Sequence, residues 1–513
     1  MKAELIGNKK FKYQKGQSAV EILVALAVLV ISISAVISVV FGGQSITTDA
    51  QTNQEALYKA QALLENARAS ISADFDGVVT LSSLSDDIYS KTLSVLDLNP
   101  CEKEATSRVN WAIEGRPQKV EFATYLSDVA EALAIGGDCG IGGPGSDWLY
   151  PDTLADTDAE PSGNQATGID AVNKIVFLSA GVGPGPGSWP DFFIIDARNA
   201  CSSPCSPPPI ISRLDITDEG LNAVDVVKNI GPSGKDYAFV INNRETAPYN
   251  QLLVIDVTDI YNPLFVNSAS RSLPGVSGSC PYSCPQGRSL FYYQNRLYIG
   301  THRTGGGEFH VFDVSLPDNP IHLGSIELNH NVNAIYVKGT LAYLATSDDT
   351  GEVMVIDISN PASMTHPDIT GMKYNLPGNY DATSLYLLGS KLYVGRERGN
   401  PSNPDFWILD ISNPAAISPV GSKLLGLNPN TAVTGIKASG KFVFLATSDS
   451  NSGFKVLNVS NPGSPQLWSC YNYSEKSSGI DFESNFIYLS NQSNNALRII
   501  HDNVISQPSR VCN

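Results

Sequence analysis

One short pattern recurs along this chain and constrains its fold more than any other feature. It is an apolar strand that ends in Asp or Asn and runs into an Asn-Pro turn. Sharp copies occupy residues 253–263, 311–320, 355–361, 408–414 and 456–462. Weaker copies of the strand lie at residues 194–196 and 499–501, which makes seven in all. Self-similarity at a roughly fixed spacing indicates a repeat architecture.

The repeats predict a β-propeller over residues 169–513. Successive copies are spaced about 45 to 60 residues apart. Two more apolar strands precede each copy, as at residues 334–338 and 341–346. A period near 50 with about four strands per unit is typical of propeller blades. The motif resembles the LVIVD-type propeller repeat, and seven copies predict seven blades. We expect the Asp at each strand end to cap the backbone amides of its turn, which is a structural role.

The other informative stretch lies near the amino terminus. Five lysines precede Gly16, and about twenty apolar residues follow, interrupted by Glu21. A run of about that length suffices to cross a bilayer as a helix, with the lysine-rich side in the cytoplasm. An ionisable residue inside such a run is rare and usually functional. An ordinary secretory signal would end in a small-residue cleavage site, which is lacking after this run.

This arrangement resembles the class III signal of type IV pilins and pseudopilins. The resemblance implies that a prepilin peptidase cuts after Gly16 and methylates Gln17, although Phe or Met is commoner than Gln at that position. It implies that Glu21 pairs with the amino terminus of another pilin subunit during assembly. It also implies a single-pass precursor in the inner (cytoplasmic) membrane, with its amino terminus in the cytoplasm, and an extracellular pilus after assembly.

The expected fold class is an α+β pilin-like module, made of a long N-terminal helix and a small antiparallel sheet, followed by an all-β propeller. The sheet is predicted from apolar strands at residues 91–96, 107–113 and 119–126. The predicted domains are a leader (1–16), a transmembrane and filament-core helix (17–42), a pilin-like helix and head (43–140), a linker (141–168) and the propeller (169–513).

Composition narrows the partners and the compartment. The formal net charge is −17, and an acidic surface repels phosphate backbones, so nucleic-acid binding is not expected. The 8 cysteines are even in number, as in exported proteins with disulfides. Neither C-x-x-x-C pair has the spacing of a zinc or redox motif. We expect four disulfides and no metal: Cys101–Cys139, Cys201–Cys205, Cys280–Cys284 and Cys470–Cys512.

The loops of the propeller suggest where a ligand binds. In a four-stranded blade the B–C loops and the connections between blades share one face, and the Asn-Pro turns are C–D loops on the other. The B–C loops are uneven in length, unlike the Asn-Pro turns. Tyr, Trp and Arg most often anchor interfaces. We therefore expect ligand-binding residues among Trp189, Arg244, Tyr249, Arg303, Arg396 and Arg398.

No catalytic constellation emerges, so we expect neither an enzyme nor a cofactor. The 6 histidines are scattered, and no metalloprotease or nucleophile-elbow motif is present. The expected function is a minor, tip-located pilin-like subunit whose propeller adheres to an extracellular protein or glycan. The alternative is a structural pseudopilin of a type II secretion or DNA-uptake machine, with the propeller contacting machinery components.

Overall fold

A computed structural model describes residues 19–71, 74–113, 115–135, 147–158, 165–181, 189–200, 207–244, 249–278, 285–399, 402–483 and 485–504. The chain divides into two compact units. The first holds residues up to 67 together with 80–94 and 106–123, and the second holds 68–79, 95–105 and everything from residue 124 onward. Each unit is described by itself.

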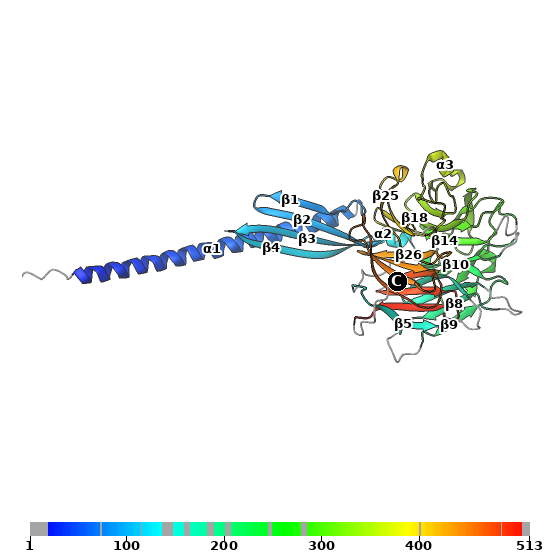
Figure 1. The fold of residues 1–513 in the computed structure, drawn as a ribbon, viewed down its shortest axis with the longest axis horizontal. Helices are drawn as coiled ribbons and strands as arrows, with labels where there is room; N and C mark the ends of the chain where they lie inside the picture. The colour runs from blue at the N-terminus through cyan, green and yellow to red at the C-terminus, as the bar shows by residue number, and fades with distance from the viewer. Residues whose placement is uncertain are drawn as a thin grey trace, which may run out of the picture. The chain divides into compact units, whose positions relative to one another are not determined.

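The described chain is mainly β. Its 32 strands form eight four-stranded antiparallel sheets (Figure 1). The α-helices besides α1 are short in the described part: α2 (Val129–Ala134) and α3 (Pro367–Thr370). Three 3₁₀ turns are shorter still: η1 (Asn267–Ala269), η2 (Pro361–Ser363) and η3 (Pro414–Ala416). The expected fold class, an α+β pilin-like module joined to a propeller, is therefore corrected to a mainly β chain.

Helix α1 (Ala19–Ile71) supplies one wall of the first unit's core. The sheet beside it runs in the order β1 (Leu81–Asp86), β2 (Tyr89–Asn99), β3 (Glu102–Ile113) and β4 (Arg116–Ser127). Ala56 and Ala60 are fully buried, because small side chains let the helix approach Tyr89 and Trp111 on the sheet. Lys59 adds an ion pair to Asp86, with 2.7 Å between Nζ and Oδ2.

The remaining seven sheets are the blades of a propeller. In each, the strands are called A to D in order across the sheet, and neighbouring A strands lie side by side around the axis, ending with β30 beside β6. Blades 1 and 2 are β6 (Gln165–Val172), β7 (Ile175–Gly181), β8 (Phe192–Asp196), β9 (Ile210–Leu214), and β10 (Leu221–Ile230), β11 (Lys235–Asn242), β12 (Leu252–Asp256), β13 (Leu264–Phe265). Blades 3 and 4 are β14 (Gly287–Tyr293), β15 (Arg296–Thr301), β16 (Phe309–Asp313), β17 (Ile321–Ile326), and β18 (Val332–Lys338), β19 (Leu341–Thr346), β20 (Val353–Asp357), β21 (Lys373–Tyr374). Blades 5 and 6 are β22 (Ala382–Leu388), β23 (Lys391–Arg396), β24 (Phe406–Asp410), β25 (Ser418–Lys423), and β26 (Val433–Ser439), β27 (Phe442–Thr447), β28 (Phe454–Asn458), β29 (Gln466–Tyr471). Blade 7 is β30 (Ser477–Glu483), β31 (Phe486–Asn491), β32 (Leu497–Asp502) and β5 (Pro151–Thr157).

Blade 7 closes the ring with strands from both ends of the propeller sequence. Strand β5 lies beside the red carboxyl-terminal strands in Figure 1 and pairs with β32. In this pairing Thr157 lies opposite Leu497. The predicted linker at residues 141–168 is therefore wrong in part, because β5 and the start of β6 lie within it. A turn-rich sequence concealed these strands, since β5 becomes a strand only by pairing with a segment that lies more than 300 residues away.

The blades pack face to face, which explains why their middle strands are apolar on both sides. All four residues from Leu252 to Ile255 in β12 are at most 4% exposed. One apolar cluster joins two blades: it contains residues of β11 and β12 in blade 2 and of β14, β15 and β16 in blade 3. A strand buried on both faces is a continuous apolar run rather than an alternating one, as the repeat pattern requires.

The Asp or Asn that ends each sharp copy of the repeat caps its turn, as predicted. In five blades its side-chain oxygen accepts the backbone N–H two residues later. The donor–acceptor pairs are Thr258–Asp256, Ser315–Asp313, Ser359–Asp357, Ser412–Asp410 and Ser460–Asn458, at 2.8 to 3.1 Å.

Candidate functional site

The residues that carry the pilin resemblance lie at or beyond the edge of the described part of the chain. Gly16 and Gln17 lie outside the described residues, and Glu21 lies in α1 with its side chain undescribed. Within the described residues, no helix is long and apolar enough to span a membrane. The expected single-pass precursor in the inner membrane is corrected accordingly.

Two of the cysteines are placed. Cys101 and Cys470 are both disulfide-bonded and almost fully buried. Their predicted partners, Cys139 and Cys512, lie outside the described residues, as do Cys201, Cys205, Cys280 and Cys284. The pairings therefore stay predictions.

Four of the predicted ligand anchors lie on or beside the B–C loops with part of their surface accessible. Arg244 stacks on Tyr249, with 3.3 Å between the guanidinium carbon and the ring centroid, and pairs with Glu219 at 3.3 Å. Trp189 is half-buried and Arg303 is exposed. Stacking on Tyr249 and pairing with Glu219 hold Arg244 in one place, which suits a contact surface.

Arg396 and Arg398 are structural instead. Arg396 is completely buried, and its guanidinium donates to the carbonyls of Pro377, Gly378 and Tyr380. Burial is the main cause that lowers the pKa of Arg396. Arg398 lies 3.5 Å from the buried carboxylate of Asp405. These two arginines brace connections within the propeller, so neither enters the proposals below.

A repeated irregularity in the innermost strands builds the site. In all seven A strands the register against strand B shifts at one bulged residue near the strand's start. A bulge re-aims the side chain that it carries. We call these seven positions the bulge residues: Thr167, Asn222, Arg288, Asn333, Thr383, Thr434 and Ser478.

Six of the bulge residues join neighbouring blades. Each donates a side-chain hydrogen bond to the first or second carbonyl of the next A strand, as Thr434 does to Ser477 at 2.9 Å. The other five donor–acceptor pairs are Thr167–Leu221, Asn222–Gly287, Asn333–Ala382, Thr383–Val433 and Ser478–Ala166, at 2.6 to 2.7 Å. The last of these bonds joins blade 7 to blade 1 and so closes the ring.

Arg288 is the exception among the bulge residues. In blade 3 the bond to the next blade is made one residue later, by the hydroxyl of Ser289 to the carbonyl of Val332 at 2.9 Å. The guanidinium of Arg288 instead lies 2.9 Å from Nε2 of His302. Its charge is therefore available for something other than holding the ring together.

The bulge residues line a polar funnel of about 390 Å³ at the end of the propeller formed by the B–C loops, which we call the B–C mouth. The residues that follow strand B in several blades add a second tier, including Asn243, His302, Glu397 and Gln492. Burial, and secondly Arg288, lower the pKa of His302 to about 4, so its ring is neutral and can accept a bond from Arg288. Burial raises the pKa of Glu397, as does Asp381, whereas Arg288 lowers it.

Three of the anchors predicted from the sequence lie one residue away from the lining of this mouth. Asn243, His302 and Glu397 directly precede Arg244, Arg303 and Arg398, and successive side chains along an extended segment point to opposite sides. For Arg288 the signal is an alignment of the A strands, in which Arg288 replaces a small hydroxyl or amide residue.

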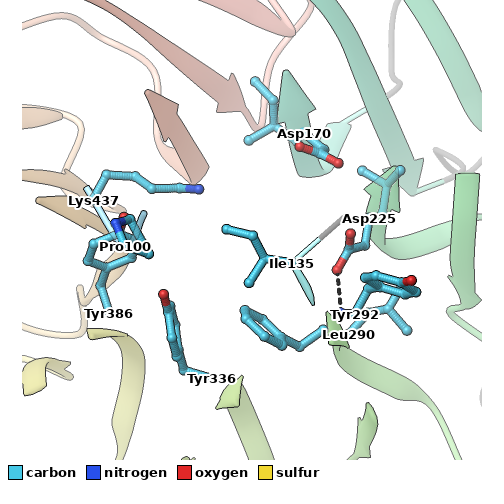
Figure 2. A pocket seen from close by; sticks show the side chains of 12 residues that line it. Pro100, Ile135, Asp170, Asp225, Leu290, Tyr292, Tyr336, Tyr386 and Lys437 are labelled. Carbon is cyan, nitrogen blue, oxygen red and sulfur yellow. Dashed lines mark hydrogen bonds between the residues drawn. The ribbon is translucent and has the colours of Figure 1, made fainter. Parts of the chain in front are cut away.

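The other end of the axial channel, the A–B mouth, is occupied by this chain's own residues within the second unit. Tyr293 donates to Glu131 at 3.0 Å, Gly440 N–H donates to the carbonyl of Asp97 at 3.0 Å, and Lys338 pairs with Asp76 at 2.7 Å. Figure 2 shows Ile135, which follows α2, pointing into a cavity of about 170 Å³.

A second ring surrounds that cavity, three residues after each bulge. Its members are Asp170, Asp225, Phe291, Tyr336, Tyr386, Lys437 and Asp481. The three aspartates each accept a backbone N–H from the next blade, as Asp225 does from Tyr292 at 2.7 Å (Figure 2). Lys437 pairs with Asp481 at 2.6 Å. These acids therefore connect neighbouring blades through their hydrogen bonds.

The comparison with protein families supports the propeller repeats. Residues 331–367, 381–423 and 432–473, which are blades 4 to 6, match the LVIVD repeat family. This part of the chain carries LVIVD repeats. No curated protein matches the chain. The prediction of an LVIVD-type propeller is thus confirmed, whereas the family match gives no support to a pilin.

Among solved structures, one similar chain comes from a mitotic checkpoint complex. It is 12% identical with a TM-score of 0.45, covering 72% of this chain and 96% of that one. Another is the WD40 β-propeller domain of Doa1, 12% identical with a TM-score of 0.44, covering 70% of this chain and 99% of that one.

Proposed function

We propose that this chain is a binding protein whose propeller takes its ligand at the B–C mouth, without catalysing a reaction on it. The observation that carries the proposal is the exception at Arg288. Six of the seven bulge residues are used in joining the blades, and the seventh places a guanidinium in a polar funnel. A half-buried charge is costly to place, so an arginine at a bulge position whose bond to the next blade is made by Ser289 instead indicates recognition.

The contacts at the A–B mouth also favour the B–C mouth as the place where a ligand binds. Glu131, Asp97 and Ile135 already contact the propeller there, so a partner would have to displace them. The B–C mouth carries uneven loops and the accessible residues Tyr249 and Arg303, which could extend the contact with a protein or glycan partner beyond the funnel.

Binding can be tested with the full chain on arrays of extracellular proteins and glycans. We expect Arg288→Gln to weaken captured signals at least tenfold, as the loss of a charged anchor usually does. Arg213→Gln, which changes an exposed arginine on the outer strand β9, is the matched control. If Arg288→Gln binds every captured partner as the parent does, the proposed site is wrong.

The narrower proposal concerns how the propeller is presented, and it rests on the sequence from Gly16 to Glu21 alone. We propose that the chain is processed as a prepilin, with a minor pilin-like subunit favoured over a pseudopilin of a secretion or DNA-uptake machine. The mature protein should then begin at methylated Gln17 by intact-mass analysis. Cleavage of Gly16→Ala at the same bond would contradict this.

A further inference from the structure

The side chains that line the funnel restrict the chemical class of its ligand. This inference rests on the proposed binding function. Among the described residues, the funnel is lined by side chains with hydroxyl, amide, imidazole and charged groups, and the one apolar residue in the lining is Ala432. No phenyl, phenol or indole ring belongs to that wall as described. A ligand here is therefore bound by hydrogen bonds and charge, since there is no aromatic face for a sugar or base to stack on.

Arg288 supplies the positive end of the site. One of its five N–H groups is directed at His302, and within the described part of the chain no carboxylate lies in ion-pair contact with it. Asp381 and Glu397 act on it only at longer range. A planar guanidinium with free donors is suited to a carboxylate, which it can bind through two parallel hydrogen bonds.

Glu397 supplies the negative end of the funnel lining, and Asp381, which is not part of that lining, lies next to it. Both belong to blade 5, at the end of strand B and just before strand A, and Glu397 donates its backbone N–H to the carbonyl of Asp381 at 3.0 Å. Among the described residues no cation lies in ion-pair contact with either carboxylate, and Arg288 acts on both at longer range. Two neighbouring acids attract a positive group, whereas Arg288 in blade 3 would repel a cation that lacks a negative end.

From this separation of charge we propose that the funnel binds a small zwitterion of the α-amino acid class. Its carboxylate lies against Arg288, and its ammonium group faces Glu397, since both residues line the funnel. The amides of Asn243 and Gln492 also line the funnel, where they can bond to the remaining polar atoms. A funnel of about 390 Å³ is of the size that takes small ligands.

The test is calorimetry on the full chain with L-glutamine and L-alanine, set against acetate, methylammonium and glucuronate. We expect an amino acid to bind at least tenfold more tightly than acetate or methylammonium. Arg288→Gln and Glu397→Gln should each weaken that binding tenfold or more, and Arg288→Lys should restore part of it. Arg213→Gln should bind as the parent does, and equal thermal melting of all variants excludes a folding defect.

The other outcomes separate the two proposals. If glucuronate binds and the amino acids do not, the zwitterion is wrong and an acidic sugar replaces it, while the binding site stands. Binding of methylammonium as tight as that of amino acids makes the ligand a cation and likewise overturns the zwitterion. If no small compound binds but Arg288→Gln abolishes an array signal, the ligand class is wrong and the proposed function stands. If Arg288→Gln changes neither the calorimetric binding nor the array signal, the proposed ligand class and the proposed binding site are both wrong.

Discussion

Asp225, in the axial channel, joins two blades through a hydrogen bond, and its effect on the stability of the fold depends on pH. It accepts a hydrogen bond from the N–H of Tyr292 in the next blade (Figure 2). Burial raises its pKa from 3.8 to about 6, while Tyr292 and Lys437 lower it and Asp481 raises it. The pKa of Asp225 is higher in the folded protein than in the unfolded chain. Asp225 therefore makes its full contribution to the free energy of unfolding below about pH 4, and this contribution is lost as the pH rises through 6.

Asp225→Asn should therefore stabilise the protein at pH 7.5 and not at pH 4.5. The amide oxygen can still accept the N–H of Tyr292, but no buried charge has to be maintained. We expect a gain of about 1–2 kcal/mol in the free energy of unfolding at the higher pH. Urea unfolding at both pH values measures it, with Asp349→Asn on an exposed loop as control. An equal effect at the two pH values would contradict the assignment.

At the scale of elements, the bulge in each A strand is what holds neighbouring blades together. It turns one polar side chain out of the regular alternation and toward the backbone of the next blade. The carbonyl that receives this bond lies in a buried or half-buried strand, so leaving it without a donor is expensive. The same device that closes the ring also forms the rim of the funnel, where Arg288 departs from it.

Thr434→Val tests the bulge bond with almost no change in shape. The hydroxyl that donates to the carbonyl of Ser477 at 2.9 Å is lost, and the methyl groups fill its place. We expect a loss of about 1–3 kcal/mol in the free energy of unfolding, because a partly buried acceptor stays unsatisfied. Thr365→Val, at an exposed position, should cost little. Equal denaturation midpoints for the two variants would show that the bond contributes nothing.

For the whole molecule, closure of the propeller depends on β5 and on Trp148 just before it. Trp148 is fully buried among Phe444, Phe454 and other side chains of blades 6 and 7, and its indole N–H donates to Asn485 at 3.0 Å. The N–H of Tyr150 also donates to Asp502, at 2.7 Å. These contacts attach the start of the propeller sequence to its end.

Trp148→Ala should weaken this closure strongly. Removing a large buried side chain leaves a cavity and costs about 3–5 kcal/mol. The expected result is a lower denaturation midpoint together with faster hydrogen exchange in β5 and β32. Trp189→Ala, which changes a half-buried indole beside a B–C loop, should cost less than half as much. A loss at Trp148 no larger than at Trp189 would mean that the ring is not closed here.

The sequence by itself determined the blades. Apolar runs that end in Asp, such as residues 355–357, can be satisfied only by strands buried on both faces, and their period sets the propeller and the turn caps. These are local signals, since each depends on residues a few positions apart. The resemblance at Gly16 to Glu21 remains a sequence inference.

Tertiary structure decided the rest. Whether β5 is a linker or a strand depends on β32, and whether Arg396 is an anchor or a brace depends on the loop at residues 377–380 that surrounds it. That Arg288 makes no bond to the next blade, unlike its six counterparts, depends on how neighbouring A strands pack against one another. Burial, long-range pairing and the direction of a bulged side chain are set by neighbours distant in sequence, so no local pattern could give them.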